Sequence, residues 1–301
     1  MEYLSVSENM NKTENHIPHN LIHVAEEYGY SKAIKSSKQS FGLAVFAGIF
    51  IALAFVFYIT VTTGAQGSSW GFVHLLGGLA FSLGLILVVI CGAELFTSSV
   101  LSTVTWANKN ITTSTLLKMW LRVYCGNLIG ALFILLLVMS AGLYQLDGGA
   151  WGLNALKVAQ HKIHHSWLQA FSLGILCNML VCLAIWMTFS TKNVMTRAFL
   201  VILPVAMFVS CGFEHCIANM FMVPLGIAIS HLADSSFFSA LGVSQSQFSD
   251  LTISHFIYNN LIPVTLGNIV GGGVVIALGN WLIEHTPAKS AECNNEKLSL
   301  S

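Results

Sequence analysis

Long apolar stretches separated by short polar segments dominate the sequence. A helix needs about 20 apolar residues to cross a hydrocarbon core of about 30 Å, and six stretches are long enough. None shows the alternation of polar and apolar positions that is typical of a membrane-embedded strand. We therefore expect an all-α membrane protein with six transmembrane helices, at about residues 41–62, 72–102, 119–143, 167–189, 198–230 and 256–284.

Two correspondences along the chain predict an internal repeat. The second and fifth stretches are longer than one crossing requires, and each is interrupted by a similar tetrapeptide: Cys-Gly-Ala-Glu at 91–94 and Cys-Gly-Phe-Glu at 211–214. Gly-Asn-Leu-Ile-Gly at 126–130 likewise corresponds to Gly-Asn-Ile-Val-Gly at 267–271. We expect two three-helix halves, at about 41–143 and 167–284. Because each half has an odd number of spans, the halves are predicted to lie inverted in the membrane, as in many transporters.

Composition supports this class and charge orients it. Hydrophobic residues make up 55% of the 301 residues and charged residues 9%, against about 25% charged residues in soluble proteins. Disordered, nucleic-acid-binding and disulfide-scaffold classes are thereby excluded. Of the 13 Lys and Arg residues, 11 fall on the side of both termini, so we expect both termini in the cytoplasm. The predicted division is a cytoplasmic segment 1–40, a transmembrane domain 41–285 and a cytoplasmic tail 286–301.

The two helix interruptions are the candidate functional site. Broken helices expose backbone groups that hydrocarbon cannot satisfy, so they are tolerated where they line a cavity or pack against protein. Glu94 and Glu214 are the carboxylates at membrane depth, where a charge is costly and needs compensation. We favour a bracing role for both over direct substrate contact. New half-helices are expected to begin near Thr97-Ser98-Ser99, which are good N-cap residues, and near residues 216–219. Their N-termini attract small anions.

His215 is the titratable base at this centre, and its reference pKa of about 6.5 suits a change of charge near neutral pH. We favour a functional role for it over that of a structural hydrogen-bond donor. Apolar side chains near the breaks are candidates for pore constrictions, although plain packing is the more common role of such residues. They are Phe81, Phe208, Leu85, Leu95 and Val181.

A histidine cluster supports an alternative of another class. His161, His164 and His165 form an H-x-x-H-H pattern in a predicted outer loop, which resembles one histidine box of membrane di-iron oxidoreductases. The remaining histidines are scattered and form no second box. We therefore expect no metal, no cofactor and no enzymatic activity, and keep the oxidoreductase as the different-class alternative. A receptor or scaffold without a pore would leave the paired breaks without a purpose.

Three motifs resemble signatures of the formate/nitrite transporter family. They are Gly-Ala-Glu-Leu-Phe-Thr-Ser at 92–98, Gly-Phe-Glu-His-Cys-Ile-Ala-Asn-Met-Phe at 212–221, and Asn-Leu-Ile-Pro-Val-Thr-Leu-Gly-Asn-Ile-Val-Gly-Gly-Gly at 260–273. Residues 52–64 and 161–165 are similar to its formate channels in particular. The resemblance covers roughly residues 30–285. It implies an aquaporin-like fold, assembled as a homopentamer with one pore in each protomer.

By position, the resemblance also implies roles for individual residues. Thr97 and His215 would face each other at the pore centre, with Lys162 and Asn178 poising the histidine and Asn268 supporting the polar centre. Phe81 and Phe208 would form apolar gates, and Leu85, Leu95 and Val181 would narrow the path. The expected localisation is the bacterial inner membrane, and the expected partners are formate, the lipid bilayer and further copies of the chain, with no nucleic acid.

The expected function is pH-dependent passage of formate or formic acid. Crossing apolar rings is costly for an anion unless its charge is neutralised or offset. A protonated His215 would pair with formate or give it a proton. Nitrite and hydrosulfide remain alternatives on the same scaffold, because Thr97 and His215 do not separate these small anions.

Overall fold

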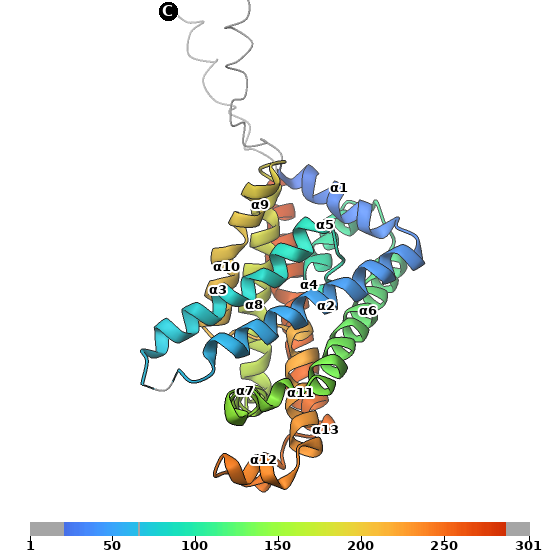
Figure 1. The fold of residues 1–301 in the computed structure, drawn as a ribbon. Coiled ribbons are helices and arrows are strands. Elements are labelled where there is room, and N and C mark those ends of the chain that lie inside the picture. Colours follow the sequence, from blue (N-terminus) through green and yellow to red (C-terminus); the bar gives the residue numbers. More distant parts are fainter. Residues whose placement is uncertain (1–20, 66, 287–301) are drawn as a thin grey trace, which may run out of the picture.

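The computed structural model describes residues 21–65 and 67–286, and within these ranges the chain is helical, without strands (Figure 1). Its first part contains a short helix α1 and three long helices. The bounds are α1 (Leu21–Ala33), α2 (Ser37–Thr62), α3 (Trp70–Ile90), α4 (Phe96–Ser99), η1 (Val100–Ser102), α5 (Thr103–Ala107) and α6 (Thr113–Ser140).

The second part follows two single turns, η2 (Leu143–Gln145) and η3 (Asp147–Gly149). Its last apolar stretch contains two π-helical segments, η5 and η6. The bounds are α7 (Ala150–Ile163), α8 (Trp167–Thr188), α9 (Val194–Leu200), α10 (Ile202–Ser210), α11 (Cys216–Leu232), α12 (Ser235–Ala240), η4 (Gln245–Phe248), α13 (Ile253–His255), η5 (Phe256–Leu261), α14 (Ile262–Ile269), η6 (Val270–Leu278) and α15 (Gly279–Glu284).

The predicted apolar stretches correspond to these helices. Five helical stretches within the described residues are long and apolar enough to cross a membrane, and the predicted fifth crossing consists of two shorter apolar helices, Val194–Ser210 and Cys216–Leu232. α6 begins six residues before the predicted residue 119 because its first turns carry hydroxyl and basic side chains. Such side chains reach toward water while their backbone continues the helix.

Local sequence explains where the long helices begin. The Ser36 side chain accepts the Gln39 N–H at the start of α2. Ser166 and Gln169 form a reciprocal capping box at the start of α8. Capping satisfies N–H groups that have no partner inside the helix. Polar caps therefore fix the first turn of helices whose remaining residues are apolar on all sides.

Close helix contacts occur at corresponding glycines. A Cβ added at Gly130 of α6 would lie 2.0 Å from the Val45 carbonyl oxygen of α2, and one at Gly271 would lie 2.2 Å from the Ile175 carbonyl oxygen of α8. Small residues at helix contacts allow backbones in membranes to approach closely. α2 thus packs against α6 as α8 packs against the α14–η6 stretch.

The described part of the predicted N-terminal segment is helical and packs against the rest of the bundle. α1 packs along η1 and α5, and Thr105 Oγ1 donates to the Glu26 carbonyl oxygen over 2.9 Å. α2 begins at Ser37 rather than residue 41. α1 also contacts α15, so the described chain begins and ends at the same end of the bundle (Figure 1). Residues 1–20 and 287–301 lie outside the described residues.

A candidate functional site built on two broken helices

Each predicted break is present and has the same backbone course. α3 ends at Ile90 and α4 begins at Phe96, while α10 ends at Ser210 and α11 begins at Cys216. Gly92 and Gly212 have φ angles of +67° and +70°. Glycine adopts this left-handed conformation without the steric penalty that a Cβ brings. A glycine at this position therefore ends the first half-helix and redirects the chain.

An asparagine from a neighbouring helix bridges each break. Asn127 Oδ1 accepts the Phe96 N–H over 2.9 Å, and its amide donates to the Glu94 and Ala44 carbonyl oxygens over 2.9 and 2.7 Å. Asn268 Oδ1 accepts the Cys216 N–H over 2.9 Å in the same manner. Both asparagines are fully buried. Backbone groups that the interruption exposes are thereby satisfied within the protein, as a membrane interior requires.

The start of α4 differs from the sequence expectation. Thr97, Ser98 and Ser99 lie inside the first turn and do not cap it, and Leu95 is the N-cap residue without a side-chain cap. Asn127 supplies the missing acceptor from another helix. At the second break His215 is itself the N-cap, and its Nδ1 accepts the Ala218 N–H over 3.1 Å.

Thr97 and His215 meet between the two breaks, as the resemblance implies. Thr97 Oγ1 lies 3.0 Å from His215 Nε2, and both residues are buried. Since Nδ1 of His215 accepts a backbone N–H, the neutral ring carries its proton on Nε2 and donates it to Thr97 Oγ1. Asn178 donates to the Thr97 and Asn268 carbonyl oxygens over 3.1 and 2.6 Å. Asn178 therefore holds the threonine's backbone and does not touch the imidazole.

Glu94 is held by two cations from the N-terminal segment. Lys32 Nζ lies 2.8 Å from its carboxylate, and Lys35 binds the second oxygen. Lys32 also donates to Ser99 Oγ over 3.3 Å. The carboxylate does not bind N–H groups of its own break, so Glu94 braces the broken helix through α1 and its following turn. Neither lysine was singled out from the sequence.

Glu214 is held by one cation and two amides. Lys162 Nζ lies 2.9 Å from Oε1, while Asn219 and Asn260 donate to Oε2 over 2.6 and 3.2 Å. Lys162 thus contacts the carboxylate beside the histidine and not the ring itself. His165 lies farther off, with Nε2 3.7 Å from Oε1. Burial lowers the pKa of His165, and the Glu214 charge opposes that shift.

A repeated sequence signal would have identified these cations. Residues 32–39 read Lys-Ala-Ile-Lys-Ser-Ser-Lys-Gln and residues 162–169 read Lys-Ile-His-His-Ser-Trp-Leu-Gln. Lysine, serine and glutamine recur at the same spacing, and His165 replaces Lys35. The correspondence therefore begins upstream of the first long helix, in α1 and α7. Asn219 and Asn260 have no comparable signal, since a buried asparagine in an apolar helix is found only by its partners.

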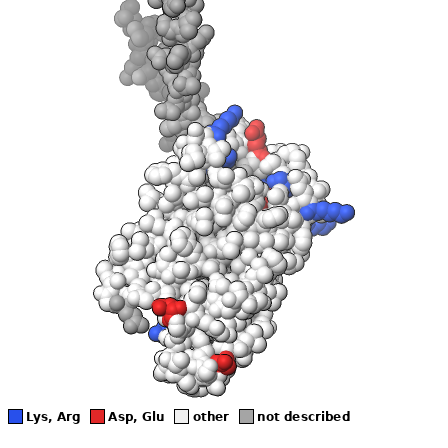
Figure 2. Space-filling model, viewed as in Figure 1, with Lys and Arg blue, Asp and Glu red and all other residues white. Residues whose placement is uncertain are grey.

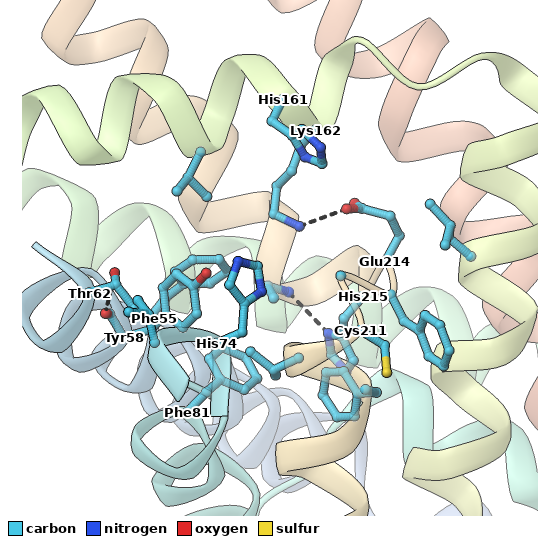
Figure 3. A pocket seen from close by; sticks show the side chains of 18 of the residues that line it. Phe55, Tyr58, Thr62, His74, Phe81, His161, Lys162, Cys211, Glu214 and His215 are labelled. Carbon is cyan, nitrogen blue, oxygen red and sulfur yellow. Dashed lines mark hydrogen bonds and ion pairs between the residues drawn. The ribbon is translucent and has the colours of Figure 1, made fainter. Parts of the chain in front are cut away.

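A cavity of about 550 Å³ opens onto His215 from the side of α7 (Figure 3). Figure 3 shows Lys162 pointing toward Glu214 across this cavity, with His74, Tyr58 and Thr62 on its other wall. Lys157, Lys162, His161 and His165 bring basic groups to the lining, and Glu214 is its carboxylate. Lys162 and Glu214 neutralise each other, so Lys157 gives the lining its net positive charge, and the lining favours an anion.

Aromatic rings close the inner end of this cavity. Phe81 and Phe208 lie edge to face with centroids 6.0 Å apart, and Phe208 stacks on His215 at 6.0 Å and 14°. Both phenylalanines line the cavity and are 3% exposed. Leu85, Leu95 and Val181 are buried and are not part of the cavity lining. The two rings therefore lie beside the imidazole in the lining of the cavity.

The side chains of the predicted histidine cluster make other contacts in the structure. His164 pairs with Asp250, and the His161 ring packs edge to face against His165 at 4.9 Å. Within residues 21–65 and 67–286, no three His, Cys, Asp or Glu side chains are grouped so as to hold a metal ion. His161 and His165 line the cavity, whereas His164 does not.

Comparison with known proteins agrees with this geometry. A sequence model of the family described as formate/nitrite transporter matches residues 19–282. The chain belongs to the formate/nitrite transporter family. It is 52% identical over 267 residues to the formate channel FocA of Escherichia coli K12, covering 89% of this chain and 94% of that one. It is 50% identical over 254 residues to FocA of Haemophilus influenzae, covering 84% and 89%.

A solved structure of this family has the same fold. It is a pentameric formate channel with formate bound, and it is 52% identical to this chain. It superposes with a TM-score of 0.77 over 83% of this chain and 98% of its own. Relatives of this chain are thus channels and transporters rather than enzymes.

Proposed function

We propose that this protein conducts formate across a membrane. The observation that carries this proposal is the hydrogen bond between Thr97 and His215 at the floor of a basic cavity, between two breaks that asparagines bridge. Formate offers two oxygens that accept hydrogen bonds, and the cavity offers donors and positive charge. The identity to formate channels supports formate as the substrate.

In this proposal, formate approaches through the cavity and reaches the imidazole. Lys162 supplies positive potential, while its pairing with Glu214 prevents it from holding the anion in a tight ion pair. The Nε2–H of His215 turns from Thr97 to a formate oxygen. Asn178 and Asn268 keep the two break segments in register as the bond changes partner.

Passage beyond His215 requires that the charge be reduced, because the Phe81 and Phe208 rings offer no polar partner to an anion. We propose that Nδ1 of His215 takes up a proton from the cavity and that Nε2 gives its own proton to formate. The products are formic acid, which passes the rings, and neutral imidazole with its proton on Nδ1; loss of that proton and uptake of one at Nε2 restore the resting tautomer. Protonation at Nδ1 costs the bond to the Ala218 N–H, so the charged imidazole is short-lived and gives up its proton readily.

We also propose the topology and assembly. Six crossings in two inverted halves are supported by the matched breaks, the matched asparagines and the shared end of the described termini. The Lys and Arg atoms visible in Figure 2 lie mainly toward that end, which supports cytoplasmic termini. The pentameric relative supports a homopentamer surrounded by lipid. A bacterial inner membrane is the location we propose.

Flux in liposomes tests the proposal. Formate, nitrite and hydrosulfide flux would be measured at two pH values on either side of 6.5, for the native protein and for His215→Phe. We expect saturable formate flux that rises toward acid pH and is lost in His215→Phe. Undiminished acid-driven uptake in that variant contradicts the proton transfer. Preferred flux of nitrite or hydrosulfide would keep the site and change the substrate.

A further inference from the structure

A second hollow, of about 670 Å³, lies at the end of the bundle where α5, α6 and α15 meet. It is separate from the cavity at His215 and shares no lining residue with it. We call it the Trp106–Trp281 hollow. Its lining is mostly apolar, with Ala107, Ile111, Leu278 and Leu282 beside the two tryptophans.

Both indole N–H groups of this hollow have partners in the protein. Trp106 Nε1 donates to Thr113 Oγ1 over 3.0 Å, and Trp281 Nε1 donates to Asn108 Oδ1. Their polar atoms are thus occupied, and what the rings offer to the hollow is apolar surface. Tryptophan held in this way is typical of the interface between hydrocarbon and headgroups.

Positive charge lies on one rim of the hollow. Lys109 is the charged residue of the lining, and within the described residues its ammonium group has no ion-pair partner. Glu26 accepts from Asn108 on the α1 side, and Glu284 lies on α15, but neither carboxylate lines the hollow. The first turn of the 28-residue helix α6 also faces this rim through Thr112 and Thr113, and it has no acidic residue.

The opposite side of the hollow is continuous with an apolar surface. Leu282 and Ile283 of α15 are 60% and 76% exposed. A soluble anion would gain nothing from this surface, whereas a lipid tail would cover it. The hollow therefore combines an apolar floor, interfacial tryptophans and a cationic rim.

We infer that the Trp106–Trp281 hollow binds an anionic glycerophospholipid. Its phosphate lies against Lys109 and the first turn of α6, and one acyl chain follows Trp106, Leu278 and Leu282. The charge of Lys109 complements the headgroup, while the apolar lining accounts for the tail. The site is separate from the proposed transport site, since it shares no lining residue with the cavity at His215.

Lipid retention tests this inference. The purified assembly would be exchanged into detergent, titrated with phosphatidylglycerol or with phosphatidylcholine of the same acyl chains, and analysed by native mass spectrometry. Lys109→Gln is expected to weaken phosphatidylglycerol binding about fivefold, the effect of about 1 kcal/mol for one basic residue near a headgroup. Phosphatidylcholine binding should not change.

Lys118→Gln is the matched control, because Lys118 is exposed on the same end of α6 but does not line the hollow. An equal loss in both variants, or no loss in Lys109→Gln, overturns the inference. Ala107→Trp fills the apolar floor and should lower retention of both lipids.

Photo-crosslinking identifies the occupant directly. Leu282→p-benzoylphenylalanine, irradiated in membranes, is expected to yield a protomer whose mass has increased by one phospholipid. A covalent dimer of this chain, or a link to its own residues, would mean that protein covers the hollow and would overturn the lipid assignment.

Discussion

The two breaks share a backbone but differ in how their carboxylates are neutralised. At the first break Glu94 is bound by Lys32 and Lys35, which leaves one net positive charge. At the second break Glu214 is bound by Lys162 and by the amides of Asn219 and Asn260, which leaves none. The first break, which is followed by Thr97, thus carries the additional cation. The charges at the second break, beside His215, are balanced.

This difference indicates which charged and polar neighbours suit a titratable base such as His215. A fixed positive charge beside His215 would oppose its protonation, and an unpaired Glu214 would hold the proton as a salt bridge. Amide donors orient the carboxylate without adding charge. The charge balance of the second half therefore suits the proton transfer that we propose for His215, whereas Thr97 needs no such balance.

The largest expected effect comes from removing the lone cation of the second break. Lys162→Met leaves Glu214 buried and uncompensated, and a broken buried pair costs about 3–5 kcal/mol. Thermal unfolding of the purified assembly should show a marked loss of stability. Adding Glu214→Gln should recover much of it, and a double variant as unstable as Lys162→Met would contradict the pairing.

The equivalent change at the first break should have a smaller effect. Lys32→Met leaves Glu94 with Lys35, so we expect less destabilisation than in Lys162→Met, measured in the same way. Combining Lys32→Met with Lys35→Met should exceed the sum of the single effects, because only the double variant leaves the carboxylate unpaired. Strict additivity would argue against a shared site.

Removing an amide that binds Glu214 should lower stability by less than Lys162→Met does, and it should also change transport. Asn219→Ala removes a hydrogen bond to a charged group, worth about 1.5–3 kcal/mol. We expect lower stability and a changed pH dependence of formate flux, because Glu214 becomes free to turn toward His215. Asn154→Ala, which removes an amide on the cavity wall that does not contact Glu214, is the comparison and should leave the pH dependence unchanged.

A smaller effect is expected at Thr97. Thr97→Val removes the hydroxyl that pairs with His215, a net loss of about 0.5–1.5 kcal/mol for a neutral hydrogen bond. Stability should change little while formate flux falls, and Thr97→Ser should restore the flux. Equal flux in the valine and serine variants would show that the hydroxyl is dispensable.

The smallest expected effect is a pH dependence from His165. Burial holds its pKa below its value in the unfolded chain, so the unfolded state binds more protons as pH falls below about 6.5. The free energy of unfolding should therefore be independent of His165 above that pH and should decrease as the pH falls below it. Unfolding temperatures of the native protein and His165→Gln, compared between pH 7.5 and 5.5, should show a shallower decline in the variant.

The sequence was sufficient for those features that repeat or that are costly in a membrane. A charge or a helix break in hydrocarbon is costly unless the protein compensates it. This cost identified both breaks, both glutamates and His215 from the sequence. The meeting of Thr97 and His215 came from family resemblance, since no spacing rule brings residues 118 positions apart into contact.

Contacts made by residues that no sequence pattern singled out were not predicted. Lys32 and Lys35 looked like ordinary cytoplasmic charges, and only the folding of α1 against α5 brings them to Glu94. Asn219 and Asn260 lie 41 positions apart and share one carboxylate oxygen. Such networks depend on helix register, and the π-helical turns of residues 256–261 change that register in a way that apolar periodicity does not reveal.

The asparagine bridges have a consequence for the mobility of the backbone at the two breaks. The amide hydrogens of Phe96 and Cys216 are each bonded to a side chain from another helix, so their exchange with deuterium should be as slow as in an unbroken helix. The interruptions then act as fixed joints rather than hinges. In the proposed transport, passage would then depend on rotation of the Phe81, Phe208 and His215 side chains, while the backbone of the two interruptions stays in place.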